Sequence, residues 1–341
     1  MGRIIIITLL LCSMNLTAQQ VLNFRVVDTT TYQQYLRGDW KELIQSGDEA
    51  LDQGINYYYL QIRIAYAHFM RQEYRTAMKY YNNALEFNSK DHVANEFLYY
   101  CYLYSGRSND ALLQTKYLTT AQKKAMNIAD SANIVSLGIK YSYASSNAET
   151  IQDAIVNDLT VFENGIQKTI NNFHLPKLDL SHKIGKHLVI NHSLSYLQKN
   201  EFSYALNSGF FLSPEQIMSQ VEYGLSLEIT PAKGWLIRPG FNYLNMKVPL
   251  FEFSNYGPST GRDRPVFSYA NITNRIFSFL VSKEFRYFNV GLSYANNNFN
   301  MLQTHQAGIH SSIYPLANLN LYYSFDLYLQ HLQYNEQSDL N

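Results

Sequence analysis

Apolar and polar side chains alternate along several stretches in the second half of the chain. In Val221–Ile229 every odd position is apolar or aromatic, and every even position is Glu, Gly or Ser. The same two-residue period returns in Leu137–Tyr143, Phe288–Tyr294 and Leu319–Leu327. Because successive side chains of a strand point to opposite faces, each stretch predicts a strand with one apolar and one polar face.

This alternation predicts nine strands after residue 131. The connections between them are mostly short and long in turn, and the tight turns include Pro231–Gly234 and Tyr314–Ala317. An outer-membrane β-barrel has short periplasmic turns and longer external loops, so this order favours a barrel whose first strand starts on the periplasmic side. A soluble β-sandwich, which also alternates, is the alternative. The predicted strands are 132–144, 170–182, 187–198, 217–230, 234–247, 267–282, 287–298, 303–314 and 318–331.

Nine strands do not fit a closed bacterial barrel, in which the strand count is nearly always even. An open edge inside lipid would leave backbone groups unpaired at several kcal/mol each. The last residues, Tyr334–Asn341, are polar and do not end on an aromatic. We therefore expect a sequence that stops before its barrel is complete, with about three strands missing from an even-numbered set. A miscount by one strand is the alternative.

The first half of the chain has a helical period and repeats itself every 34 residues. Gly38, Gln72 and Gly106 share one phase of the repeat, and Ala77 and Ala111 share another. Small residues at fixed helical positions allow helices to approach closely.

These residues resemble a tetratricopeptide repeat (TPR) array, whose unit is a 34-residue helix–turn–helix. In the middle unit Ala65, Tyr74, Ala77, Tyr81 and Ala84 stand at the family's small and large positions, while His68 replaces a usual aromatic and Ser89 a usual Pro. The resemblance implies an all-α superhelix of about three repeats.

The N-terminus indicates export. Arg3 precedes the apolar run Ile4–Cys12, and Leu16–Ala18 forms a suitable cleavage site, as in a secretory signal peptide. Only Cys101 then remains, which excludes an intramolecular disulfide. The formal net charge of zero argues against nucleic-acid binding. We expect a signal peptide at 1–18, a periplasmic TPR-like domain at 19–126 and an outer-membrane barrel at 127–341, an α+β multidomain chain.

The hairpin Leu227–Trp235 and the following Pro239–Tyr243 also resemble segments of the YaiO-like outer-membrane proteins. This resemblance implies a barrel in the outer-membrane lipid with a periplasmic helical domain. It carries over no catalytic residue.

Motifs for catalysis are missing from the sequence. Neither Gly-x-Ser-x-Gly nor His-Glu-x-x-His occurs, so we expect a non-enzymatic protein without a cofactor. Two histidines beside a predicted turn, His182 and His187, offer a metal pair at most, and polar residues next to a turn are the simpler interpretation. Four charged residues on polar strand faces are expected to line a barrel lumen: Glu222, Glu228, Arg238 and Asp326.

The repeat half contains a candidate partner-binding groove, from the positions that line the groove in the TPR family. Aromatic side chains on a concave face can stack on sugars or hold an extended peptide. Plain packing between repeats is the alternative. We expect a scaffold, assembly or export role with a periplasmic protein or polysaccharide as partner; a small-solute channel and a barrel enzyme acting on lipid or glycan are the alternatives. The groove residues are Tyr59, Ile62, Tyr66, Phe69, Met70, Tyr100 and Tyr104.

Overall fold

The computed structural model describes residues 22–128, 133–147, 165–206, 210–212, 214–254, 264–299 and 302–334. The predicted signal peptide and the polar C-terminal residues 335–341 lie outside the described residues. By their contacts the residues divide into a helical unit, Met1–Gln122 with Tyr314–Leu321, and a sheet unit, Lys123–Ile313 with Tyr322–Asn341. Each unit has its own architecture.

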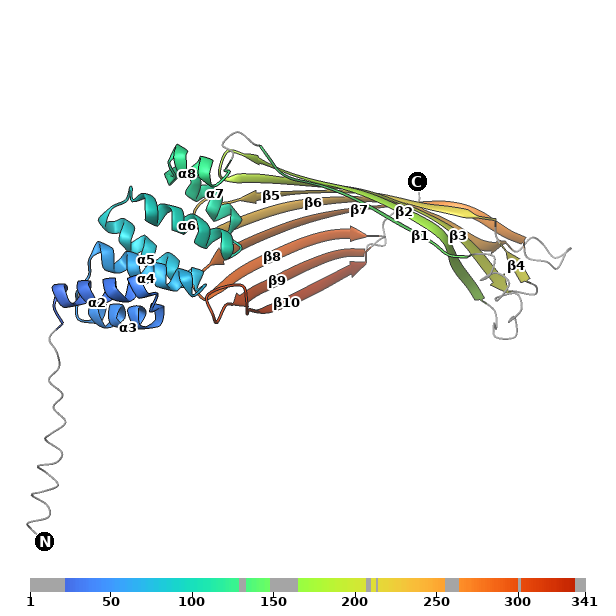
Figure 1. The fold of residues 1–341 in the computed structure, drawn as a ribbon. Helices are drawn as coiled ribbons and strands as arrows, with labels where there is room; N and C mark the ends of the chain where they lie inside the picture. The colour runs from blue at the N-terminus through green and yellow to red at the C-terminus, as the bar shows by residue number, and fades with distance from the viewer. Residues whose placement is uncertain are drawn as a thin grey trace, which may run out of the picture. The chain divides into compact units, whose positions relative to one another are not determined.

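The helical unit is an array of paired helices (Figure 1). The first helices of the three pairs begin at residues 24, 58 and 92, and the second helices begin at 40, 74 and 108, so each series advances by 34 residues. This confirms the TPR-like array of three repeats. The elements are α2 Phe24–Arg37, α3 Trp40–Asp52, α4 Tyr58–Met70, α5 Tyr74–Phe87, α6 His92–Tyr104, α7 Ser108–Gln114, η2 Thr115–Tyr117 and α8 Thr120–Ala125.

A left-handed residue ends the first helix of every repeat. Gly38, Gln72 and Gly106 have φ values of 77°, 62° and 75°. A residue in this conformation stops a helix and reverses the chain. Glycine adopts it without steric cost, whereas glutamine does so against the clash of its Cβ. The shared phase of these residues in the sequence therefore marks the turn inside each repeat.

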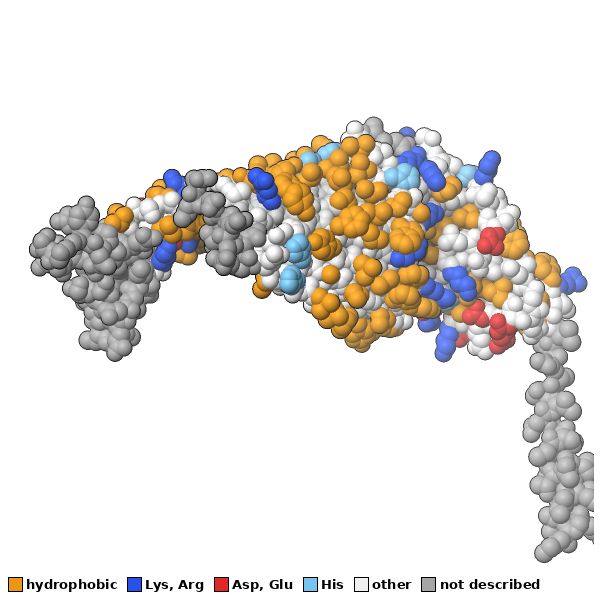
Figure 2. Space-filling view, turned by 180° about the vertical axis from the view of Figure 1, so that it is seen from behind, with side chains coloured by type: hydrophobic (Ala, Val, Ile, Leu, Met, Phe, Trp, Pro, Cys, Tyr) orange, Lys and Arg blue, Asp and Glu red, His pale blue; other side chains and the backbone are white. Residues whose placement is uncertain are grey.

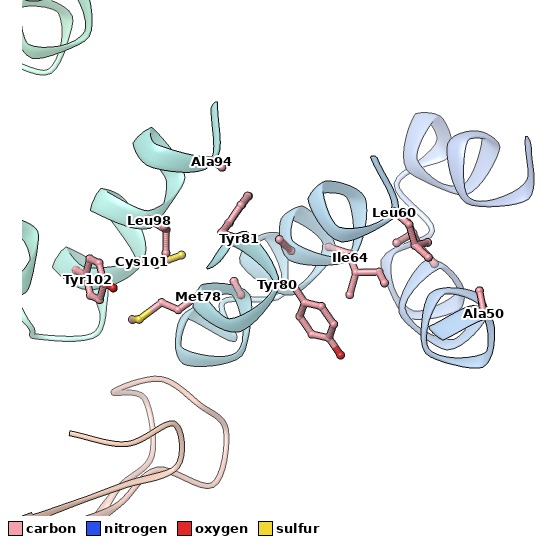
Figure 3. Close-up of a cluster of buried hydrophobic side chains, with 14 of the residues drawn as sticks. Ala50, Leu60, Ile64, Met78, Tyr80, Tyr81, Ala94, Leu98, Cys101 and Tyr102 are labelled. Atoms are coloured by element: carbon pink, nitrogen blue, oxygen red, sulfur yellow. The ribbon is translucent and has the colours of Figure 1, made fainter. Parts of the chain in front are cut away.

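The core of the array lies between the helix pairs, and Figure 3 shows its central cluster. Leu60, Ile64, Tyr81 and Leu98 are fully buried there. His68, which stands at a usual aromatic position, is also buried. Its ring stacks on Tyr80 at 5.2 Å between centroids, and its Nδ1 lies 2.6 Å from Oε2 of Glu73. The histidine thus replaces an aromatic plane with a hydrogen-bonded one.

The segment Tyr314–Leu321 belongs to the helical unit although it lies between two strands in the sequence. The Arg75 guanidinium lies 3.7 Å from the centroid of the Tyr314 ring, and the Arg75 backbone N–H donates to the Ala317 carbonyl at 3.0 Å. The last strand consequently starts at Tyr323, whereas the alternation predicted a start at residue 318. That boundary was wrong because Ala317 and Asn318 are buried in helix contacts.

The sheet unit is one antiparallel sheet with the order β1-β2-β3-β5-β6-β7-β8-β9-β10 (Figure 1). All nine predicted strands are present, and the short β4, which pairs with β3, is an addition. The strands are β1 Ile134–Ser145, β2 Gly165–Ile184, β3 Leu188–Leu206, β4 Phe210–Leu212, β5 Gln216–Ile229, β6 Trp235–Ser254, β7 Arg264–Glu284, β8 Phe288–Phe299, β9 Leu302–Ile313 and β10 Tyr323–Tyr334.

Among the described residues the sheet is open, because β1 and β10 each pair on one side only. Nine successive antiparallel neighbours also leave β1 and β10 running in the same direction. Strands β2, β3, β6 and β7 have 19 to 21 residues. That is about twice the 9–11 residues that cross a bilayer, so these strands extend beyond any apolar band.

One face of the sheet is apolar and exposed. Phe279 of β7, Leu292 of β8 and Ile309 of β9 are 47%, 62% and 47% exposed on this face. Figure 2 shows a broad patch of hydrophobic side chains. The intervening residues, such as Ser278 and Ser293, face the other side. Among the helices that the structure describes, none is both long and apolar enough to cross a bilayer.

Candidate functional sites

A column of side chains repeats along the first helices of the array. Tyr32, Tyr66 and Tyr100 stand 34 residues apart on α2, α4 and α6, so they occupy the same position of each repeat. One turn further, Leu36, Met70 and Tyr104 repeat in the same way and are 64%, 45% and 46% exposed. Equivalent positions in stacked repeats face the same side of the array. We call these six residues the repeat column.

Ring contacts hold the middle of this column in place. The Tyr66 ring lies 5.4 Å from those of Tyr35 and Phe97, and 5.5 Å from that of Trp40. Such aromatic pairs contribute about 0.5–1.5 kcal/mol each beyond burial. Tyr66 is therefore a half-buried, fixed ring and not a mobile surface side chain.

At the other end of the column two rings stack. Tyr100 and Tyr104 lie 5.9 Å apart at an interplanar angle of 19°. Partial burial, followed by the charge of Glu96, raises the pKa of the Tyr100 phenol above its usual value. The hydroxyl therefore stays protonated well above neutral pH and remains able to donate a hydrogen bond.

Arg63 supports the first part of the column. Its guanidinium lies 5.1 Å from the Tyr32 ring centroid and 5.9 Å from that of Tyr59. The same group forms an ion pair with Asp28 at 2.8 Å. A cation fixed by a carboxylate and two rings makes this part of the surface polar as well as aromatic.

The predicted groove residues divide into two kinds. Tyr59, Met70 and Tyr104 are exposed, whereas Ile62 and Phe69 are half-buried and pack on the core. Tyr66 and Tyr100 are half-buried as described above. The predicted set lacks the members of the first repeat, Tyr32 and Leu36. Subtracting 34 from 66 and 70 would have found both, but the helical period was read only from Thr30 onward, although α2 begins at Phe24.

The sheet unit offers a second candidate, its polar face. Arg238 of β6 and Glu228 of β5 form an ion pair at 2.7 Å. Asp326 of β10 accepts from the His310 ring on β9 at 2.6 Å. Glu222 is exposed on β5, on the same face as Glu228. Two of the four predicted lumen residues are thus paired with each other, and the other two stand apart.

Two cavities open on this polar face. One of about 470 Å³ is lined by residues of β6 to β10, including Arg238 and Asp326. The other, of about 330 Å³, is lined by Asp179, Asn191 and Asn242 among others from β2, β3, β5, β6 and β7. Their polar lining suits water and small polar solutes.

The predicted histidine pair is not assembled. His182 stacks on His192 at 5.3 Å, and His187 Nδ1 lies 2.7 Å from the Thr230 carbonyl oxygen. His174 is hydrogen-bonded to the Tyr141 hydroxyl at 2.6 Å. No group of three His, Cys, Asp or Glu side chains suited to a metal occurs in the described part of the chain.

Comparisons with known proteins give distant likenesses. No family model matches the chain, and no curated protein does. A structure of MamA is 16% identical over 31% of this chain and 60% of that one, with a TM-score of 0.27. PcrH in complex with the chaperone-binding region of PopB is 13% identical over 31% and 86% of the two chains, with a TM-score of 0.27.

For the sheet, the CymD monoaromatic hydrocarbon channel is 8% identical over 60% of this chain and 66% of that one, with a TM-score of 0.31. The chain thus spans less than two thirds of the length of the MamA and CymD structures. TPR-type and barrel-channel neighbours both occur, and at such low scores they say nothing of function.

Proposed function

We propose that this chain is an outer-membrane barrel protein whose TPR-like unit lies in the periplasm and binds an extended segment of a partner protein. The observation that carries the proposal is the repeat column, in which Leu36, Met70 and Tyr104 remain solvent-exposed at one repeated position. Side chains that pack only between repeats would be buried. An exposed row of apolar side chains on a rigid ring layer suits an extended peptide.

The membrane part of the proposal is supported by the two-faced sheet. Its apolar face matches what lipid requires, and its polar face matches a wet interior. Helices and closed barrels are the structures that satisfy their backbone groups in lipid. The start of β1 and the turns Gly185–His187 and Thr230–Gly234 lie at the same end of the strands. In the proposed orientation that end faces the periplasm, with the helical unit.

Site-specific photo-crosslinking tests the binding role in intact envelopes. A photoreactive residue at Met70 or Tyr104 is expected to give discrete protein adducts. Lys79, exposed on α5 outside the column, is the matched control and is expected to give none. Tyr59→Ala should weaken the adducts at Met70 without changing protein level. Equal adducts at all three positions would contradict a specific groove.

A small-solute channel is a second candidate, favoured by the two polar cavities on the sheet. Reconstitution in planar bilayers tests it, because an open lumen gives discrete conductance steps. Folded protein, verified by heat-shifted gel mobility, that gives no steps would remove the channel and leave the binding role intact.

A further inference from the structure

Three side chains from adjacent strands form a hydrogen-bonded relay on the polar face of the sheet. Oγ of Ser293 on β8 lies 2.7 Å from Nε2 of His310 on β9. Nδ1 of the same ring lies 2.6 Å from Oδ1 of Asp326 on β10. Both distances fall within the range of about 2.6–3.2 Å that joins a nucleophile to its base and the base to its orienting group.

The strand register brings these three groups together. His310 stands directly opposite Asp326 on one side and Gly291 on the other. Ser293 lies two residues beyond Gly291, hence on the same face. The ring of His310 therefore spans from its direct partner to a diagonal neighbour, which long and aromatic side chains can reach.

Gly308 gives the serine its room. It stands opposite Ser293, and a Cβ at this position would lie 2.6 Å from Ser293 Oγ and 2.9 Å from Cδ1 of Tyr328. A side chain at 308 would displace one or both. The Tyr328 ring packs edge-on against His310 at 5.4 Å and limits its rotation. The relay is thus shaped by its neighbours as well as by register.

The arrangement sets the protonation pattern of the histidine. A carboxylate accepts from Nδ1–H, so Nε2 carries the lone pair and accepts from the Ser293 hydroxyl. This is the pattern of a serine activated for attack on a carbonyl carbon, and it is recognised by geometry and not by position in the sequence. The simpler interpretation is a ladder of hydrogen bonds lining a wet interior.

A ready-made space adjoins the relay. Ser293, His310 and Asp326 all line the cavity of about 470 Å³, which is within the size range of small-ligand sites. Arg238 faces the same space and offers a cation. Hydroxyl groups dominate the remaining lining, which suits a substrate rich in hydroxyls and not a long hydrocarbon chain. These lining residues are Ser278, Ser282, Ser312 and Ser324.

We propose that Ser293, His310 and Asp326 form an esterase site for small acyl esters on a polar carrier such as an O-acetylated sugar. Ser293 Oγ forms a bond to the ester carbonyl carbon while its proton moves to His310 Nε2. The C–O bond to the carrier breaks, and the carrier alcohol leaves with that proton. Water then attacks the acyl–Ser293 ester, gives a proton to His310, and releases the acid and the free serine.

This site adds an activity to the proposed binding role and does not depend on the repeat column. It departs from the sequence-based expectation of a non-enzymatic protein. A relay assembled from three neighbouring strands has no fixed spacing in the sequence, so the motif search had no means to find it.

The first test uses the full chain, purified in detergent and verified by heat-shifted mobility. A fluorophosphonate probe is expected to label it, and p-nitrophenyl acetate is expected to be hydrolysed. Ser293→Ala should abolish labelling and lower turnover at least 100-fold. Ser195→Ala, a serine opposite Glu222 on β3 and outside the cavity, is the control and should retain both. Equal labelling of folded Ser293→Ala and the parent chain would overturn the proposal.

The second test separates chemistry from structure. Asp326 is a positioning residue, so Asp326→Asn should lower kcat at least tenfold with KM unchanged, and Asp326→Glu should restore part of it. Gly308→Ala should slow labelling of Ser293 by a similar factor. Unchanged kcat in folded Asp326→Asn would overturn the relay. Hydrolysis of p-nitrophenyl palmitate but not of the acetate would overturn the assigned substrate class.

Discussion

Gln72 is the one turn residue of the array that bears a side chain in the left-handed conformation, at φ 62°. Its counterparts Gly38 and Gly106 have none to strain. We expect Gln72→Gly to stabilise the helical unit by about 0.5–1 kcal/mol, because the steric cost at Cβ disappears. Thermal melting of the full chain in detergent, followed by the helix signal at 222 nm, measures the change.

Gly38→Ala is the converse variant and should destabilise by about the same amount, since φ is 77° there. A lowered melting temperature for Gln72→Gly would show that its exposed hydrogen bond to Asn320, at 3.1 Å, outweighs the backbone strain.

Cys101 is a buried residue without a chemical role in the array. Its side chain is fully inaccessible, and burial raises the pKa of the thiol far above its usual value. The thiolate is the reactive form, so a raised pKa keeps the group inert at neutral pH. We expect maleimide to leave the folded chain unmodified at pH 7 and to label it fully in guanidinium. Rapid labelling of the folded chain would contradict this burial.

At the scale of elements, the segment Tyr314–Leu321 is the feature with the clearest energetic role. Arg75 is 3% exposed, and its cation lies over the Tyr314 ring while its backbone donates to Ala317. A desolvated cation–π contact contributes about 2 kcal/mol. We expect Arg75→Ala to lower the free energy of unfolding of the helical unit by about that amount, measured by the same melting experiment.

Lys79→Ala is the matched control. Lys79 also lies over a ring, that of Tyr80 at 5.1 Å, but it is exposed. Exposed contacts of this kind contribute about 0.5–1 kcal/mol. Equal effects of the two variants would mean that the segment does not contribute to the stability of the unit.

The 34-residue spacing also acts at the scale of elements. It places three first helices in one orientation, so a feature of one repeat recurs in the next. Tyr32, Tyr66 and Tyr100 follow from this rule alone. Their different burial does not, because the rings of Tyr35, Trp40 and Phe97 surround only the middle one.

At the scale of the whole molecule, the two faces of the sheet make opposite demands on a charge. Leu329 on β10 is 72% exposed on the apolar face, and its neighbour Gln330 faces the other side. We expect Leu329→Arg to cost about 2–4 kcal/mol in lipid if it lies near mid-bilayer, while Gln330→Arg costs little. Folding into liposomes, scored as the heat-shifted band across a urea series, measures both.

Equal sensitivity of the two positions would contradict a lipid-facing apolar surface. The two variants share strand, depth and added charge, so their difference reports the face alone. Fractionation of cell envelopes provides the independent measurement, since the proposed location requires the chain in the outer-membrane fraction.

The direction of the outer strands limits how the sheet can close. Because β1 and β10 run the same way, closure through antiparallel pairs alone takes an odd number of further strands. Direct pairing of β1 with β10 would be parallel. The expectation of about three missing strands in an even-numbered barrel satisfies this parity, and it remains a prediction.

Local periods were enough to predict most elements. Alternation located nine strands because one face of each is apolar, and a 34-residue repeat located the helix pairs because each repeat buries the same positions. The start of β10 was missed since Leu319 and Leu321 continue the alternation although their segment belongs to the helical unit. Periodicity reports which side chains are apolar and not which surface covers them.

The candidate sites divide in the same way. The sequence alone determined that a helical repeat array precedes a two-faced antiparallel sheet, because both patterns are local and recur along the chain. Only the tertiary structure decided that Ser293, His310 and Asp326 meet, that Arg238 pairs with Glu228, and that Tyr66 is fixed among rings. Those contacts depend on strand register and helix packing, which join residues far apart in the chain and leave no period behind.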